Sequence, residues 1–73
     1  MIKQIAKING YIIDVDFENK NVILIEKYNY DVMYRPERDS NGEILFIRLG
    51  GYLEIPNYIY KLAIKRYNKY RGE

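Results

Sequence analysis

The stretch GYLEIP at residues 51–56 decides how the chain folds, because a strand-like pattern changes there into a helical one. Pro56 biases Ile55 toward an extended backbone, and it is tolerated in the first turn of a helix, where its missing N–H costs nothing. The sequence therefore predicts a helix that begins at residue 56 or 57 and extends to about residue 71.

The predicted helix of residues 56–71 has one apolar side and one basic side. On a helical wheel its apolar arc is wider than one face of a sheet requires, so we expect a second copy of the chain to cover part of it. The side chains expected at this homodimer interface are Tyr60, Ile64 and Tyr67.

Length and composition limit what the chain can do. With 73 residues it has room for a single domain, residues 1–73, whose small core is marginal without a supplement. There is no cysteine to form a disulfide and no histidine to serve as a zinc ligand or a general base. We therefore predict a protein that is not an enzyme, that holds no metal or cofactor and that is stabilised by oligomerisation.

Positive charge is concentrated in the last quarter of the chain. Residues 56–73 hold five bases and one acid, a net charge of +4, whereas residues 1–55 hold seven bases and nine acids, a net charge of −2. The cations of the predicted helix form either an ordinary solvated face or a patch that binds nucleic acid.

The composition also indicates a source and a compartment. Ile, Lys, Asn and Tyr, which are read from A/T-rich codons, are abundant, as expected for a low-GC microbe or its virus. No apolar run approaches the roughly 20 residues of a membrane span, and the amino terminus lacks the apolar centre of a signal peptide. We expect a soluble, cytoplasmic protein without contact to a membrane.

Strand patterns separated by turns fill residues 1–55. Alternation of apolar and polar residues predicts a half-buried strand at 11–17, and the aliphatic run that begins at residue 22 opens a second strand, 22–30. Residues 43–49 are apolar on both sides and predict a further strand. Residues 2–8 fit a strand or a helix, because their apolar residues are spaced both by two and by three.

The remaining segments are shorter. Residues 32–34 either prolong the second strand or form one of their own, and residues 52–55 offer a short last strand after two glycines. Residues 35–42 are polar, with Pro and Asn-Gly, which is typical of a mobile loop. The predicted fold is α+β, an antiparallel sheet of four or five strands with one C-terminal helix packed on it. Its expected core comprises Tyr11, Ile13, Val15, Phe17, Leu24, Leu45, Ile47, Ile59, Leu62 and Ala63.

One cluster of carboxylates, Asp14, Asp16 and Glu18, invites a chemical interpretation. Alternate residues of a strand lie about 7 Å apart, close enough to share a divalent ion, but a metal site would recruit further ligands from elsewhere. We favour a solvated face whose carboxylates pair with Lys20 or Lys27 across a hairpin. No catalytic residues are predicted.

The order hairpin, strand, polar loop, strand, Gly-x-x-x-x-Pro and helix resembles the positive-cofactor-four-like transcriptional coactivators. The resemblance extends from residue 8 to about residue 68 and rests on Tyr11, Asp16, Phe17, Val22 to Tyr28, Gly51, Pro56, Ile59 and Leu62. Members of that family have a four-stranded sheet and one helix, dimerise through their helices and bind single-stranded DNA along their sheets. The resemblance implies a homodimer that binds single-stranded nucleic acid with little sequence preference, in a role related to transcription.

Cations next to aromatic residues also suit single-stranded DNA or RNA, because cations contact phosphates and flat rings stack on bases. The carboxylates of residues 14–18 would repel phosphate, so we expect the contacts elsewhere. The predicted phosphate contacts are Lys27, Arg35, Arg38 and Arg48, and the predicted stacking residues are Tyr28, Tyr34 and Tyr52. The rival hypothesis is a small virus- or plasmid-encoded protein that inhibits or adapts a host protein and does not contact nucleic acid.

Overall fold

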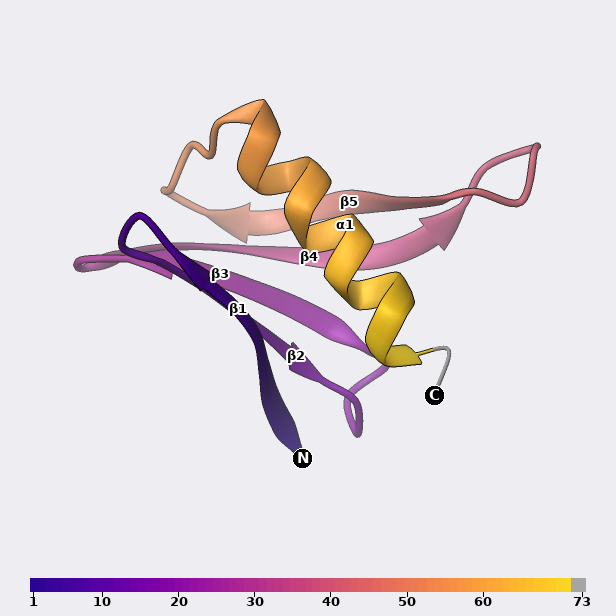
Figure 1. Cartoon of the computed structure of the whole chain (residues 1–73), viewed down its shortest axis with the longest axis horizontal. Coiled ribbons are helices and arrows are strands. Elements are labelled where there is room, and N and C mark those ends of the chain that lie inside the picture. The colour runs from indigo at the N-terminus through magenta and orange to yellow at the C-terminus, as the bar shows by residue number, and fades with distance from the viewer. Residues whose placement is uncertain (72–73) are drawn as a thin grey trace.

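The computed structural model describes residues 1–71 and has an α+β fold, in which one antiparallel sheet carries one C-terminal helix (Figure 1). Residues 72 and 73, the end of the domain predicted over 1–73, lie outside the described residues. The five strands are joined in chain order, β1-β2-β3-β4-β5, so that β1 and β5 form the two edges. The elements are β1 (Ile2–Ile8), β2 (Tyr11–Asp16), β3 (Val22–Lys27), β4 (Tyr30–Arg38), β5 (Ile44–Gly51) and α1 (Asn57–Arg71).

Three segments differ from the sequence prediction. The strand predicted over 22–30 is two strands, because Lys27 pairs with Tyr30 and leaves a two-residue turn at Tyr28-Asn29. The loop predicted over 35–42 is mostly strand, since β4 continues through Pro36, which lies opposite Phe46 of β5. Residues 52–55 form no strand, and residues 2–8, which fitted either element, are strand β1.

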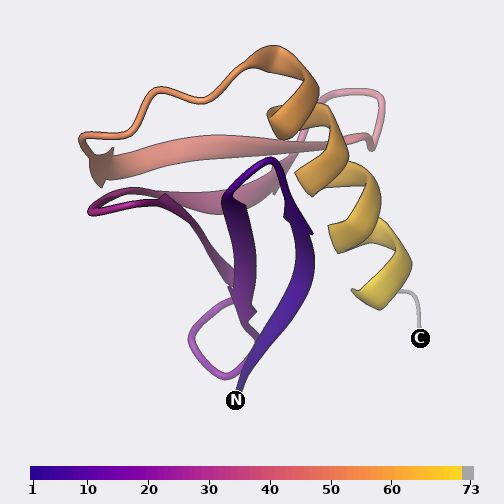
Figure 2. The same cartoon turned by 60° about the vertical axis from the view of Figure 1, so that its left-hand side comes forward.

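The helix lies across the inner side of a strongly bent sheet (Figure 2). α1 packs on both edge strands, β1 and β5, and also on β2. The core lies between the helix and the sheet and consists of Ile5, Ala6, Tyr11, Ile13, Val15, Ile23, Ile25, Val32, Tyr34, Phe46, Ile59, Ala63 and Tyr67. Nothing in residues 1–71 packs on the other side of the sheet, which we call the open sheet face.

The predicted core is correct for β2 and α1 but wrong for β5 and for β3, where Ile23 and Ile25 are buried instead of Leu24. Phe46 is 5% exposed and faces the helix, whereas Ile47 is 40% exposed on the open sheet face. Leu24 and Leu45 are half-buried on the same open face as Ile47, because side chains alternate along each strand. Both Phe17 and Leu62 are half-buried and pack against the core.

Two helix side chains close the edges of the sheet. The Tyr60 hydroxyl accepts a hydrogen bond from Phe46 N–H at 2.9 Å and donates one to Phe46 C=O at 3.1 Å. On the opposite edge Arg66 Nη1 donates to the carbonyl of Ile5, the extra residue of a bulge in β1, at 3.1 Å. Unpaired edge strands are templates for aggregation, so these contacts protect the sheet as well as fix the helix on it.

Candidate nucleic-acid interface

The residues predicted to bind nucleic acid do not form one site. The prediction for Tyr34 is wrong, because its ring is 7% exposed and packs among Phe46 and Tyr60 in the core. Arg35 lies on the open sheet face and forms an ion pair with Glu37 at 2.8 Å.

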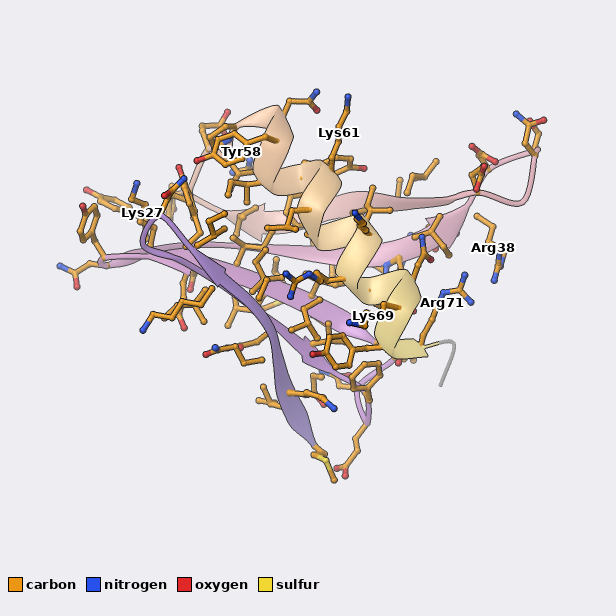
Figure 3. The ribbon with its side chains drawn as sticks, viewed as in Figure 1. Lys27, Arg38, Tyr58, Lys61, Lys69 and Arg71 are labelled. Atoms are coloured by element: carbon orange, nitrogen blue, oxygen red, sulfur yellow. The ribbon has the colours of Figure 1, made fainter. Side chains whose placement is uncertain are left out.

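The other predicted cations are split between the two ends of the molecule, whose longest dimension is 33 Å. Figure 3 shows Lys27 at one end and Arg38 at the other. Arg48 is engaged within the chain, since its guanidinium donates to Glu54 at 2.6 Å and to the Gly51 carbonyl at 2.7 Å. The predicted phosphate contacts therefore do not lie close enough together to form one binding site.

The end that holds Lys27 carries an exposed group of tyrosines. Tyr28 and Tyr52, both predicted stacking residues, are 87% and 89% exposed. Tyr28 has a φ of 58°, a left-handed conformation that a bulky residue adopts only at a cost. Lys27 Nζ lies 4.4 Å from the centre of the Tyr11 ring, so one cation is already stacked there.

The two sides of the sheet differ in charge. Alternation along the strands and the register of their pairs place five carboxylates and two bases on the open sheet face, a net charge of −3. The carboxylates are Asp14, Asp16, Glu26, Asp31 and Glu37, and the bases are Lys7 and Arg35. This face repels phosphate, whereas the helix side carries the exposed Lys61, Lys65 and Lys69.

Two hollows adjoin at the carboxyl end of α1, and together we call them the basic groove. One has a volume of about 430 Å³ and the other about 410 Å³, and both are lined by Asn21 and Arg71. The larger is also lined by Lys20, Pro36, Glu37, Arg38, Ile44 and Tyr67, and the smaller by Lys3, Phe17 and Tyr70. Among residues 1–71, four cations and one carboxylate line the two hollows, and that carboxylate, Glu37 at the end of β4, is already paired with Arg35.

The cations of the basic groove are held in place by rings and by backbone. Lys3 Nζ lies 4.6 Å from the centre of the Tyr70 ring, and the Arg71 guanidinium lies 5.8 Å from that of Tyr67. Arg38 Nη1 donates to the Gly42 carbonyl at 2.6 Å. Their charges remain available, because within residues 1–71 none of the three cations takes part in an ion pair.

The β2–β3 turn supplies the remaining cation of the groove. Lys20 and Asn21 have φ values of 55° and 61°, so two consecutive residues adopt the left-handed conformation. Asparagine tolerates this conformation well and lysine less well, which costs on the order of 1 kcal/mol. The turn brings Lys20 to the larger hollow, which Arg38 of β4 and Arg71 of α1 also line.

The carboxylate cluster of residues 14–18 pairs differently from the prediction. The terminal ammonium of Met1 lies 2.8 Å from Glu18 and 3.7 Å from Asp16, in place of Lys20 or Lys27. Asp14 takes part in no ion pair within residues 1–71, and burial raises the pKa of its carboxyl above the ordinary value of 3.8.

All three residues predicted at a dimer interface pack against their own chain. Tyr67 is 3% exposed and belongs to the core, so its assignment to an interface is wrong. The Tyr60 hydroxyl bonds to the backbone of β5, and Ile64 is half-buried against the core. The homodimer itself stays a prediction.

Sequence reasoning missed most of the basic groove. Of its four cations only Arg38 was among the predicted contacts, while Lys3, Lys20 and Arg71 were not. The excess positive charge after residue 56 was the available signal, but it did not indicate which other segments meet the end of the helix. That meeting depends on the path of β1, on the β2–β3 turn and on the extension of β4.

Comparison of the chain with protein families, with curated proteins and with solved structures found no match. Over residues 1–71 no helix is both long enough and apolar enough to cross a membrane.

Proposed function

We propose that this protein binds single-stranded nucleic acid with little sequence preference, through the basic groove and the adjoining lysines of α1. The observation that carries the proposal is the convergence of four cations from four segments on two adjoining hollows that, within residues 1–71, are lined by one carboxylate. Phosphate groups are the polymeric anions that such a surface attracts most strongly, because each neutralised phosphate releases counterions.

Rings within the groove favour a single strand over a duplex. Phe17 and Tyr70 are half-buried and line the smaller hollow, where a base can stack on an aromatic face. Both hollows are shallow and open to solvent, as suits a strand that lies along the surface. Stacking tolerates every base, so sequence preference should be small.

The proposal moves the contact surface relative to the coactivator resemblance. Those proteins bind DNA along their sheets, but here the open sheet face has a net charge of −3 and would repel a phosphate backbone. The helix side is the side that attracts it. A cytoplasmic homodimer with a role related to transcription belongs to the same proposal.

The test is fluorescence anisotropy of a labelled mixed-sequence oligonucleotide, measured over a range of salt concentrations. With four phosphate contacts, the slope of log K against log salt should be about −2.8, from about −0.7 per contact on a single strand. Tyr70→Ala should cost roughly 1–3 kcal/mol of binding free energy, irrespective of base sequence.

Charge reversals at matched positions locate the contact. Lys20→Glu should weaken binding about tenfold at low salt, because an attraction becomes a repulsion. Lys7→Glu makes the same change in net charge on the open sheet face and should alter affinity less than about twofold. Absence of binding at the lowest salt, or equal losses in the two variants, would show that the basic groove is not the binding site.

A further inference from the structure

The open sheet face has an apolar centre that no part of residues 1–71 covers. Leu24 of β3 lies directly opposite Met33 of β4, and Met33 is 41% exposed. A hollow of about 180 Å³ extends from this pair toward β1 and is lined by Ile2, Asp14, Asp16, Asn19, Val22, Leu24 and Met33. Contiguous exposed apolar surface of this kind is typical of sites that bind another molecule.

The carboxylates around this centre are poorly compensated. Glu26 of β3 and Asp31 of β4 are directly opposite each other, a like-charge pair that destabilises a sheet. Neither they nor Asp14 take part in an ion pair within residues 1–71. A cation brought to this face would relieve the repulsion, so its charge pattern favours a basic occupant.

We propose that the open sheet face is a docking site for a basic amphipathic segment of a partner protein. Apolar side chains of the segment occupy the strip formed by Val22, Leu24 and Met33. Its lysines or arginines pair with the carboxylates of Asp14, Glu26 and Asp31 at the border of that strip. This surface is separate from the basic groove, which lies on the helix side.

Charge argues against the other occupants of the face. Two open sheet faces packed against each other would oppose five carboxylates with five, so a symmetric dimer through this surface is unfavourable. The outer side of α1 from a second copy is basic, but it offers lysines and Asn68 rather than aliphatic side chains for the apolar strip. Nucleic acid is repelled by the net charge of this face.

The test uses a labelled peptide of about 15 residues, long enough to form a helix, with leucines on one side and lysines on the other. Two comparison peptides replace the lysines by glutamates or the leucines by serines. The leucine–lysine peptide should bind at low salt, and neither comparison peptide should bind with similar affinity. Binding of the serine–lysine peptide as tightly as the leucine–lysine peptide would overturn the proposal, since the apolar strip would then contribute nothing.

Variants of the protein locate the docking site. Asp31→Lys and Met33→Lys should each weaken binding of the leucine–lysine peptide, the former by about tenfold because attraction becomes repulsion. Glu43→Lys makes the same charge change as Asp31→Lys at an exposed residue in the β4–β5 loop and should leave affinity unchanged. Far-UV circular dichroism confirms that each variant is folded.

Three results overturn the docking site. The first is that the leucine–lysine peptide does not bind at the lowest salt. The second is that Glu43→Lys weakens binding as much as Asp31→Lys, which would make the effect one of net charge. The third is a parent protein that is dimeric by light scattering and becomes monomeric on Met33→Lys, which would assign the face to a second copy.

Discussion

Replacing Tyr60 with phenylalanine tests whether the helix closes the free edge of the sheet. The hydroxyl of Tyr60 bonds to both the N–H and the C=O of Phe46, and β5 has no further strand beside it in residues 1–71. Tyr60→Phe keeps the ring, which packs edge-on against the Phe46 ring at a centroid distance of 5.8 Å. The change therefore removes two hydrogen bonds and leaves a donor and an acceptor unpaired, with little loss of packing.

The expected loss of stability follows from the N–H and C=O groups of Phe46 that Tyr60→Phe leaves without a partner. A hydrogen bond contributes about 0.5–1.5 kcal/mol net, and a buried group left unpaired costs about 1–3 kcal/mol. The site is only part-buried, so water reaches it in the variant, and we expect a loss of about 1–2 kcal/mol in the free energy of unfolding. In urea, with a slope of about 1 kcal/mol per molar for a small domain, the midpoint should fall by about 1–2 M at unchanged slope.

A second tyrosine of α1 provides the matched control. The Tyr58 hydroxyl accepts one hydrogen bond from Asn9 Nδ2 at 2.9 Å, in an exposed position where water can replace it. Tyr58→Phe makes the same chemical change and should cost less than about 0.5 kcal/mol. Equal midpoints for the Tyr58→Phe and Tyr60→Phe proteins would refute the claim that Tyr60 seals the edge of β5.

Three further changes test the fold and its electrostatics by urea unfolding. Gly51→Ala should destabilise the protein by several kcal/mol, because φ is 112° and a Cβ would meet the backbone of β4 at 2.6 Å, whereas Gly50→Ala meets nothing within 4 Å and should be tolerated. Phe46→Ala should lower the free energy of unfolding by about 3–5 kcal/mol, and Ile47→Ala should lower it by about 1 kcal/mol or less. A larger loss for Ile47→Ala than for Phe46→Ala would show that Ile47, and not Phe46, faces the core. Burial raises the pKa of Asp14, so the folded state binds its proton more readily than the unfolded state. Asp14→Asn should therefore stabilise the protein at pH 7, and this gain should vanish as the pH falls through the raised pKa toward 3.8.

The sequence predicted correctly those elements whose pattern of apolar and polar residues fits only one kind of secondary structure. β2 alternates strictly, and Pro56 marks the start of α1, so both elements were placed to within about a residue. β5 is different, because Leu45, Phe46 and Ile47 are all apolar and periodicity cannot decide which of them faces inward. A shift of one residue exchanges the two faces of a strand. The prediction for β5 made this shift, because it placed Leu45 and Ile47 in the core instead of Phe46.

Backbone conformation explains the missed strand boundary. The β3–β4 turn consists of Tyr28-Asn29, and Tyr28 takes a left-handed φ that hairpins usually assign to glycine or asparagine. Asn29 is the one turn-forming residue between Lys27 and Tyr30, and no glycine accompanies it. The charges of residues 35–38 and Pro36 likewise indicated a loop. A proline is compatible with a strand there, because the pairing of β4 with β3 ends at Tyr34 and Pro36 pairs only with Phe46 of β5.

The residues that make up the two candidate surfaces could be identified only once the fold was known. Asp14, Glu26 and Asp31 come from three strands and share a face only once the register of the sheet is known. The basic groove likewise joins residues that lie up to 68 positions apart, from Lys3 to Arg71. Sequence reasoning predicted cations beside aromatic rings, but it did not indicate which of these residues meet in the fold.

The separation of charge between the two sides also changes the relation between the two functional hypotheses. Binding of nucleic acid and binding of a host protein were rival hypotheses because size, composition and the lack of catalytic groups fit both equally well. The basic groove and the open sheet face lie on opposite sides of a molecule whose smallest extent is 20 Å. The Debye length is about 8 Å at physiological ionic strength, so charge bound on one side is largely screened from the other. The two proposals together predict that both surfaces can be occupied at once, so that the protein would hold a basic partner next to a nucleic acid of opposite charge.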